Sequence, residues 1–79
     1  MIRVRLFAAL RELAGSSEVE GSGRTVGEVA DDLSARYGER FAGIAAVSSF
    51  VLNGERAGGS TPVADGDELA VLPPVSGGA

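Results

Sequence analysis

One well-marked helix in the middle of the chain places the strongest limit on the fold. Thr25 and Glu28 form the Thr-x-x-Glu pattern of a capping box, in which both side chains bind free amides at a helix start. The apolar residues that follow share one helical face until Gly38, a common helix terminator: Val26, Val29, Ala30, Leu33 and Tyr37. We predict a main helix at about residues 26–37, which must bury this face against another element.

Strand patterns precede this helix. Ile2, Val4 and Leu6 alternate with arginines, which indicates a strand with one buried face. From Phe7 to Ala14 the apolar spacing becomes helical, and Gly15 follows where a helix cap is expected. We predict a short helical turn there, and a short edge strand around Val19 that returns beside the first strand.

The second half of the chain contains further strand signals. Residues 39–49 are predicted to be a connection, with Phe41 and Ile44 as core anchors. Residues 50–52 form a strand that enters a tight hairpin at Asn53-Gly54, because Asn-Gly supplies the positive backbone angles such turns require. A short strand and a turn at residues 65–67 then lead to the last strand, residues 68–72.

This element order indicates an α+β fold. If the first and last strands pair in parallel at the sheet centre, the helix covers one face and leaves the other to solvent or a partner. The arrangement is a β-grasp (ubiquitin-like) roll with a mixed sheet of four to five strands and one main helix. We predict a single domain at residues 1–72, followed by a flexible tail at residues 73–79.

Composition limits the chemistry of this domain. The 79 residues include no Cys, His or Lys, the residues that most often act as bases or nucleophiles near neutral pH. We therefore predict no catalytic side chain, no metal site and no stably bound cofactor. The net charge of −4 argues against nucleic acid and favours a basic partner surface, and no apolar run is long enough to span a membrane. These features predict a cytoplasmic protein.

The last eight residues, "LPPVSGGA", stand apart from the strand that precedes them. Pro73 and Pro74 cannot donate to a sheet, so the strand ends at Leu72. Gly77 and Gly78 lack a Cβ and can enter a slot too narrow for other residues. A frayed terminus would also fit. The functional interpretation is a stiff base with a slim tip that extends roughly 20 Å, at about 3.3 Å per residue, into a partner's active site.

Three segments, in this order, resemble the MoaD/ThiS family of small ubiquitin-like sulfur carriers, and within it the small subunit of molybdopterin synthase. They are "VRLFAALRELAG" at residues 4–15, "VLNGE" at residues 51–55 and "DGDELAVLPPVSGG" at residues 65–78. The resemblance extends over the whole chain. The aromatic residues that many members carry before the proline pair are replaced here by Val71 and Leu72, which predicts a docking surface with less aromatic area.

This resemblance implies a cycle of sulfur transfer. An activating enzyme of the MoeB type would adenylate the terminal glycine with ATP, and a sulfur donor would convert it to a thiocarboxylate. The tail would then enter a MoaE-like large subunit and deliver the sulfur. By the same resemblance Gly78 would carry the thiocarboxylate and Gly77 would line the channel beside it. The docking surface would comprise Phe7, Leu72, Pro73, Pro74 and Val75, although Phe7 could equally be a core residue.

One residue follows the diglycine. Activation at Ala79 would shift Gly78 by about 3.8 Å, a displacement that at a preorganised site costs about a hundredfold or more in rate. We expect a metalloprotease to remove Ala79 first. The alternatives are that the activating enzyme accepts Ala79, or that the alanine is not part of the natural sequence. Carriers for thiamin, cysteine or tRNA thiolation, and ubiquitin-like modifiers or binding modules, remain alternative functions.

Overall fold

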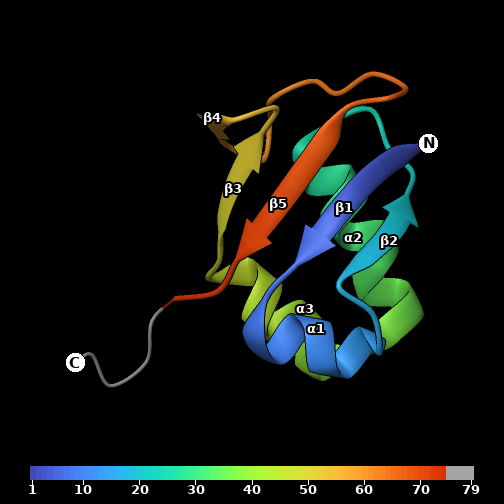
Figure 1. The fold of residues 1–79 in the computed structure, drawn as a ribbon, viewed down its shortest axis with the longest axis vertical. Helices are drawn as coiled ribbons and strands as arrows, with labels where there is room; N and C mark the ends of the chain where they lie inside the picture. Colours follow the sequence, from blue (N-terminus) through green and yellow to red (C-terminus); the bar gives the residue numbers. More distant parts are fainter. Residues whose placement is uncertain (75–79) are drawn as a thin grey trace.

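The computed structural model describes residues 1–74, and it has the expected α+β architecture (Figure 1). The elements in chain order are β1 (Ile2–Leu6), α1 (Ala8–Ala14), β2 (Glu18–Gly21), α2 (Val26–Tyr37), α3 (Glu39–Ala46), β3 (Ser49–Leu52), β4 (Glu55–Ala57) and β5 (Glu68–Leu72). The strands form one five-stranded sheet in the order β2-β1-β5-β3-β4. The β-grasp prediction is confirmed, with the predicted edge strand around Val19 as β2.

The two terminal strands lie side by side at the centre of the sheet. β1 and β5 pair in parallel, with Val4 opposite Leu69 and Leu6 opposite Val71. The other neighbouring strands pair antiparallel. Because β1 and β5 run in the same direction, the residues that follow each strand leave the sheet at the same end (Figure 1).

The main helix has the predicted bounds, and its capping box forms with one difference. The Thr25 hydroxyl accepts a hydrogen bond from the Glu28 amide at 3.1 Å. The Glu28 carboxylate accepts from the amide of Arg24, one residue before the cap, at 2.8 Å. One amide of the first helical turn and the amide of the residue before the cap are therefore satisfied at the helix start.

The prediction of a connection at residues 39–49 was wrong, because most of this segment is the helix α3. Gly38, with φ of 104°, ends α2 and also caps the start of α3, so one glycine separates two helices. The predicted anchors are correct: Phe41 is 1% exposed, and Ile44 packs partly buried against the core. The structure therefore contains two helices, α1 and α3, besides the main one within residues 1–74.

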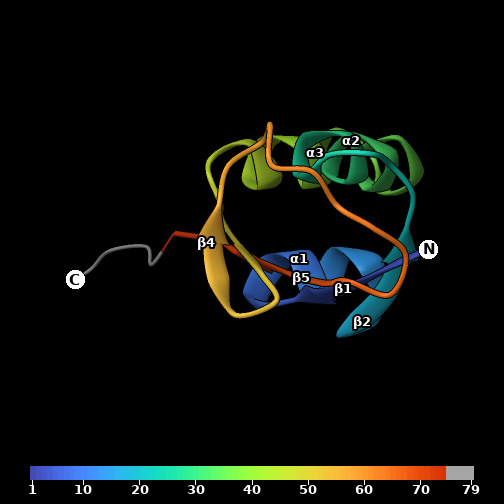
Figure 2. The same ribbon diagram turned by 90° about the horizontal axis from the view of Figure 1, so that it is seen from above.

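The helices α2 and α3 form a layer over one face of the sheet, and α1 lies beyond the ends of β1 and β5 (Figures 1 and 2). The core lies between these layers. It consists of Ile2, Val4, Leu6, Leu10, Val26, Val29, Leu33, Phe41, Ala45, Leu69 and Val71. No helix among the described residues covers the opposite face, and none is long and apolar enough to cross a membrane.

Two turns are joined at the end of the sheet away from α1. Asn53 and Gly54 form the predicted hairpin turn, with φ of 51° and 87°. The Asn53 side chain donates to a carboxylate oxygen of Asp67 at 3.1 Å and accepts from the Glu68 amide at 2.9 Å. The second carboxylate oxygen of Asp67 accepts from the Ala64 amide at 2.8 Å. This network fixes the β3–β4 hairpin to the start of β5.

Candidate functional site

Phe7 lies where β1 passes into α1. It keeps an extended backbone, with φ of −130° and ψ of 153°, so it continues the alternation of β1 and lies on the same face as Arg5. Phe7 is 36% exposed, so the alternative that it is a core residue is wrong. Ala8 follows with φ of 54°, a left-handed conformation that costs a residue with a Cβ about 1–2 kcal/mol. The turn that directs Phe7 outwards is therefore held by its surroundings.

The base of the tail lies beside Phe7. β5 buries Leu69 and Val71 and presents Ala70 and Leu72 on the other face. The ladder with β3 ends where Leu72 pairs with Ser49, and the two prolines that follow have no amide hydrogen to extend it. Pro73 is half-buried and Pro74 is exposed. Because Leu6 pairs with Val71, the next residues of the two strands, Phe7 and Leu72, lie at the same end of the uncovered face.

A shallow hollow of about 200 Å³ extends across the uncovered face from Phe7 towards the β3–β4 turn. It is lined by Arg5, Phe7, Val51, Gly54, Glu68 and Ala70. Ala70 pairs with both Arg5 and Val51, so the centre of this row is apolar. We call the exposed surface formed by this hollow, Leu72 and the two prolines the tail-base surface.

The charged groups at the rim of the tail-base surface are only loosely held. The Arg5 guanidinium lies 3.7 Å from a Glu68 carboxylate oxygen and 6.0 Å from the centre of the Phe7 ring. Both charged side chains are substantially exposed, and such pairs contribute little to stability. A partner can therefore replace this ion pair with its own polar contacts at small cost. The arrangement suits an apolar side chain of another protein, with a polar group beside it.

The described residues hold no group of three or more His, Cys, Asp or Glu side chains that could bind a metal.

The carboxyl group whose pKa is clearly displaced is that of Asp67. Its pKa is lowered by the hydrogen bond from the Ala64 amide and then by the one from Asn53. This group fastens two turns and lies away from the tail-base surface. Val75, Gly77, Gly78 and Ala79 lie outside the described residues.

Five residues of this surface were not predicted from the sequence, namely Arg5, Val51, Gly54, Glu68 and Ala70. The alternation of residues 2–6 and 68–72 does assign Arg5 and Ala70 to outward faces. The alternation shows only which face of the sheet each residue lies on. The pairing of Arg5 with Ala70 depends on the register between strands that are far apart in the sequence.

The fold and this uncovered sheet face define a ubiquitin-like β-grasp protein. The ThiS family model matches residues 4–78, and the chain belongs to this family of ubiquitin-like sulfur carriers. The match includes both glycines and ends one residue before Ala79. No curated protein is significantly similar to the chain in sequence.

Several solved structures are similar over nearly the whole chain. The small archaeal modifier protein SAMP1 from Haloferax volcanii is 37% identical with a TM-score of 0.74, covering 98% of each chain. The CysO chain of the Amycolatopsis orientalis BexX/CysO complex is 30% identical with a TM-score of 0.82, covering 99% of this chain and 100% of that one. The complex of subunits 1 and 2 of the molybdopterin-converting factor from Helicobacter pylori gives 25% identity and a TM-score of 0.62, with 98% and 97% covered.

Proposed function

We propose that this sulfur carrier serves as the small subunit of molybdopterin synthase, with Gly78 as the residue that carries sulfur. The observation that carries the proposal is the exposed Phe7, which lies with the half-buried Leu72 at the end of the sheet where the proline pair begins. A partner that binds this surface would receive the tail beside it. The Helicobacter pylori complex, in which subunits 1 and 2 of a molybdopterin-converting factor are joined, supports such an assembly.

The proposed chemistry takes place at the carboxylate of Gly78 and needs no side chain of this protein. A MoeB-like enzyme binds ATP, and an oxygen of the carboxylate attacks the α-phosphate with release of pyrophosphate. A sulfur donor such as hydrosulfide then attacks the acyl carbon and displaces AMP, and the thioacid loses its proton. Inside a MoaE-like subunit the thiocarboxylate sulfur displaces an oxygen substituent from a carbon of the acceptor molecule, and water then hydrolyses the resulting thioester, which leaves the sulfur on the acceptor and returns the carboxylate of Gly78.

The first test is mass spectrometry of the tail. The full chain and a version ending at Gly78 are incubated with a MoeB-like enzyme, ATP and hydrosulfide. We expect the Gly78-ended protein to gain the mass of one sulfur in place of one oxygen. Omission of ATP is the control. If neither protein changes in mass, the sulfur-carrier cycle at Gly78 is wrong.

The same reaction tests Ala79. We propose that a metalloprotease removes Ala79 before activation, so the full chain should react slowly until it is trimmed. The intact mass of the protein isolated from its native host provides the decisive measurement. Full-length protein that carries sulfur on Ala79 would contradict trimming.

The docking role of Phe7 is tested by Phe7→Ala, with Glu12→Gln on α1 as a control at another exposed site. We expect Phe7→Ala to weaken binding to a MoaE-like or MoeB-like partner by about tenfold or more, as loss of an interface aromatic commonly does. The variant should keep its fold by circular dichroism. Unchanged affinity for both partners would remove Phe7 from the docking surface.

A second candidate function has a specific observation in its favour, namely the 37% identity to the modifier SAMP1. In that case the activated tail would be joined to amines of other proteins. The similarity to CysO also leaves a third alternative, in which this chain is a sulfur carrier for another pathway. Thiamin, cysteine and tRNA thiolation are such pathways. Co-purification of a MoaE-like subunit would favour the molybdopterin role, whereas amide-linked adducts through Gly78 would favour the modifier.

A further inference from the structure

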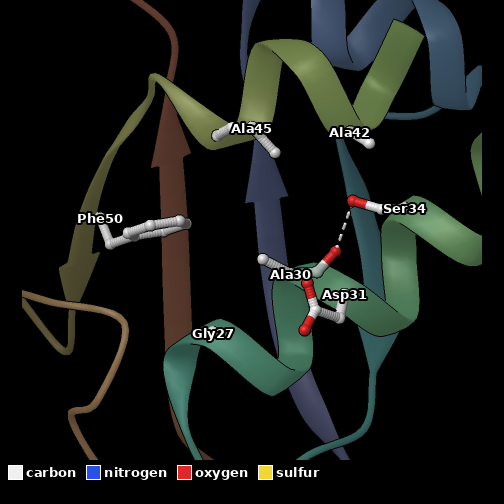
Figure 3. A pocket seen from close by; sticks show the side chains of 8 residues that line it. Gly27, Ala30, Asp31, Ser34, Ala42, Ala45 and Phe50 are labelled. Carbon is white, nitrogen blue, oxygen red and sulfur yellow. Dashed lines mark hydrogen bonds between the residues drawn. The ribbon is translucent and has the colours of Figure 1, made fainter. Parts of the chain in front are cut away.

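A groove of about 250 Å³ opens between α2, α3 and the start of β3 (Figure 3). It shares no lining residue with the tail-base surface. Phe50 points from β3 into the space between the sheet and the helices and forms one wall. Gly27, Ala30 and Ser34 line it from α2, and Ala42 and Ala46 line it from α3.

The groove exists because the two helices present small side chains to each other. Positions 27, 30 and 34 lie on one face of α2, one turn apart, and all three residues are small. The Ser34 hydroxyl donates to the Ala30 carbonyl at 2.8 Å, as the dashed line in Figure 3 shows. Since this hydroxyl is already bonded within its own helix, the walls beside it offer mainly apolar contact.

Asp31 supplies the charge at this groove. Its side chain is exposed, and it takes part in no ion pair or side-chain hydrogen bond within residues 1–74. The neighbouring Asp32 differs, because it binds Arg36 at 3.0 Å and accepts from the Ser22 amide. The residues three and four positions from Asp31 along α2 are Gly27, Glu28, Ser34 and Ala35, none of which is a cation. The carboxylate of Asp31 is therefore available to a charge from outside.

We propose that this groove binds the side chain of an arginine presented by a partner protein, with the aliphatic stem among the small residues and the guanidinium at Asp31. Long cationic side chains bury their stems along apolar surface while the charged end stays at the rim. The volume is below the roughly 300–1,000 Å³ typical of small-molecule sites, so one side chain fits it better than a whole ligand. The net charge of −4 also favours a basic partner.

This second docking site lies on the helix side of the sheet, whereas the tail-base surface is on the uncovered side. A protein held at the groove would therefore leave the tail-base surface accessible. The groove neither uses Gly78 nor depends on sulfur chemistry. An experiment can therefore disprove the groove proposal without affecting the proposed function, and the reverse.

The test uses the full chain and two capped tripeptides, acetyl-Gly-Arg-Gly-amide and the same peptide with citrulline, which has nearly the shape of arginine without its charge. Amide chemical shifts are followed by NMR during titration. We expect saturable shifts in the millimolar range with the arginine peptide, confined to the amides around Gly27, Asp31, Ser34, Ala42 and Ala46. The citrulline peptide should bind about threefold to fivefold more weakly, as loss of one exposed ion pair predicts.

Two variants with matched controls sharpen the result. Asp31→Asn should bring the arginine peptide to the affinity of the citrulline peptide, whereas Glu12→Gln on α1, which changes net charge equally, should not. Ala46→Leu should fill the groove and abolish the shifts, whereas Ala35→Leu, at an exposed position of α2 outside the groove, should leave them unchanged.

Three outcomes would overturn the proposal. They are an absence of saturable shifts, equal binding of both peptides, and shifts spread over the uncovered sheet face. Sedimentation of the unliganded chain tests a second copy as occupant, because an arginine of another molecule could fill the groove. If the chain associates with itself and Asp31→Asn abolishes this association, the occupant of the groove is an arginine of a second copy and not one of a partner protein.

Discussion

Two of the three phenylalanines, Phe7 and Phe41, show how differently the two sides of the sheet are used. Phe41 lies on α3 in the core, is 1% exposed, and its ring centre is 5.3 Å from that of Tyr37. Phe7 is 36% exposed on the uncovered face. A sheet with helices on one side needs only that side for its core. The covered face therefore maintains the fold, and the uncovered face is left available for the contacts with other proteins that we propose.

The chemistry of the faces follows the same division. The buried residues among positions 1–74 are all apolar apart from Gly21, and none is polar or charged. The uncovered face carries ion pairs between strands, Arg3 with Glu18 and Arg5 with Glu68. Substitutions at matched positions on the two faces should therefore differ in what they change.

The largest difference is expected for the phenylalanines themselves. Phe41→Ala should lower the free energy of unfolding by about 3–5 kcal/mol, because it removes a fully buried ring and leaves a cavity. Phe7→Ala should lower it by less than about 1 kcal/mol. Urea unfolding followed by circular dichroism measures both. Phe41→Leu provides a milder comparison that keeps more of the protein folded, with an expected loss of about 1.5 kcal/mol or less. Equal losses at the two positions would contradict the assignment of the faces.

Adjacent residues of β2 provide the second comparison. A Cβ added at Gly21 would lie 2.9 Å from Cγ1 of Val29 and 3.5 Å from Cγ2 of Val4. Since a branched valine in a packed core has little freedom to move, Gly21→Ala should cost about 1–3 kcal/mol. Glu20→Ala, one residue away on the uncovered face, should change stability by about 0.5 kcal/mol or less. Thermal unfolding of both variants tests the pair, and a neutral Gly21→Ala would show that the α2 contact can relax.

Much of this fold could be predicted because its signals are local. Ile2, Val4 and Leu6 alternate, Thr25 and Glu28 mark the start of α2, and these elements have the predicted bounds. The helix α3 was missed because its sequence, ERFAGIAA, contains a glycine and few large apolar residues from which to recognise a period. Its stability depends on packing Phe41 and Ala45 into the core, which is a tertiary effect.

The candidate site was predictable only in part for the same reason. Leu72 and the two prolines are marked by the end of the strand pattern. The exposure of Phe7 could not be decided from its helical spacing, because it depends on the extended backbone at Phe7 and the left-handed one at Ala8. The link between Asn53 and Asp67 also went unrecognised, since it joins two turns that are separate in the sequence.

The Asn53–Asp67 link lies at the end of the sheet away from the tail, and it should respond to mutation and to acid. Asn53→Gly keeps the positive φ of the turn but removes both side-chain hydrogen bonds, and should cost about 1 kcal/mol. The pKa of Asp67 is lowered in the folded protein, so its contribution is present above the unfolded value of about 3.9 and is lost as the pH falls through the lower folded value.

Unfolding curves measured from pH 7 downwards test the predicted direction of this pH dependence. The wild-type protein should lose the contribution of Asp67 only below about pH 3.9. Asn53→Gly should make this part of the acid loss smaller, because one of the two bonds that lower the pKa is gone. Asp67→Asn should remove this part of the acid loss altogether, because the titrating carboxyl group is gone. A contribution that instead disappeared between pH 5 and pH 7 would contradict a lowered pKa.

The smallest effects are expected from the ion pairs of the uncovered face. Arg3 and Glu18 approach to 3.8 Å with both side chains about half exposed. A double-mutant cycle of Arg3→Gln and Glu18→Gln should therefore give a coupling of about 0.5 kcal/mol or less, which added salt reduces further. The same double-mutant cycle on Asp32 and Arg36 of α2 is the control on the helix layer. The Arg36 guanidinium lies 3.0 Å from a carboxylate oxygen of Asp32. A coupling above about 1 kcal/mol for Arg3 and Glu18 would mean that these charges help to hold the sheet together. A negligible coupling leaves them free to pair with a partner's charges, as the docking role of this face requires.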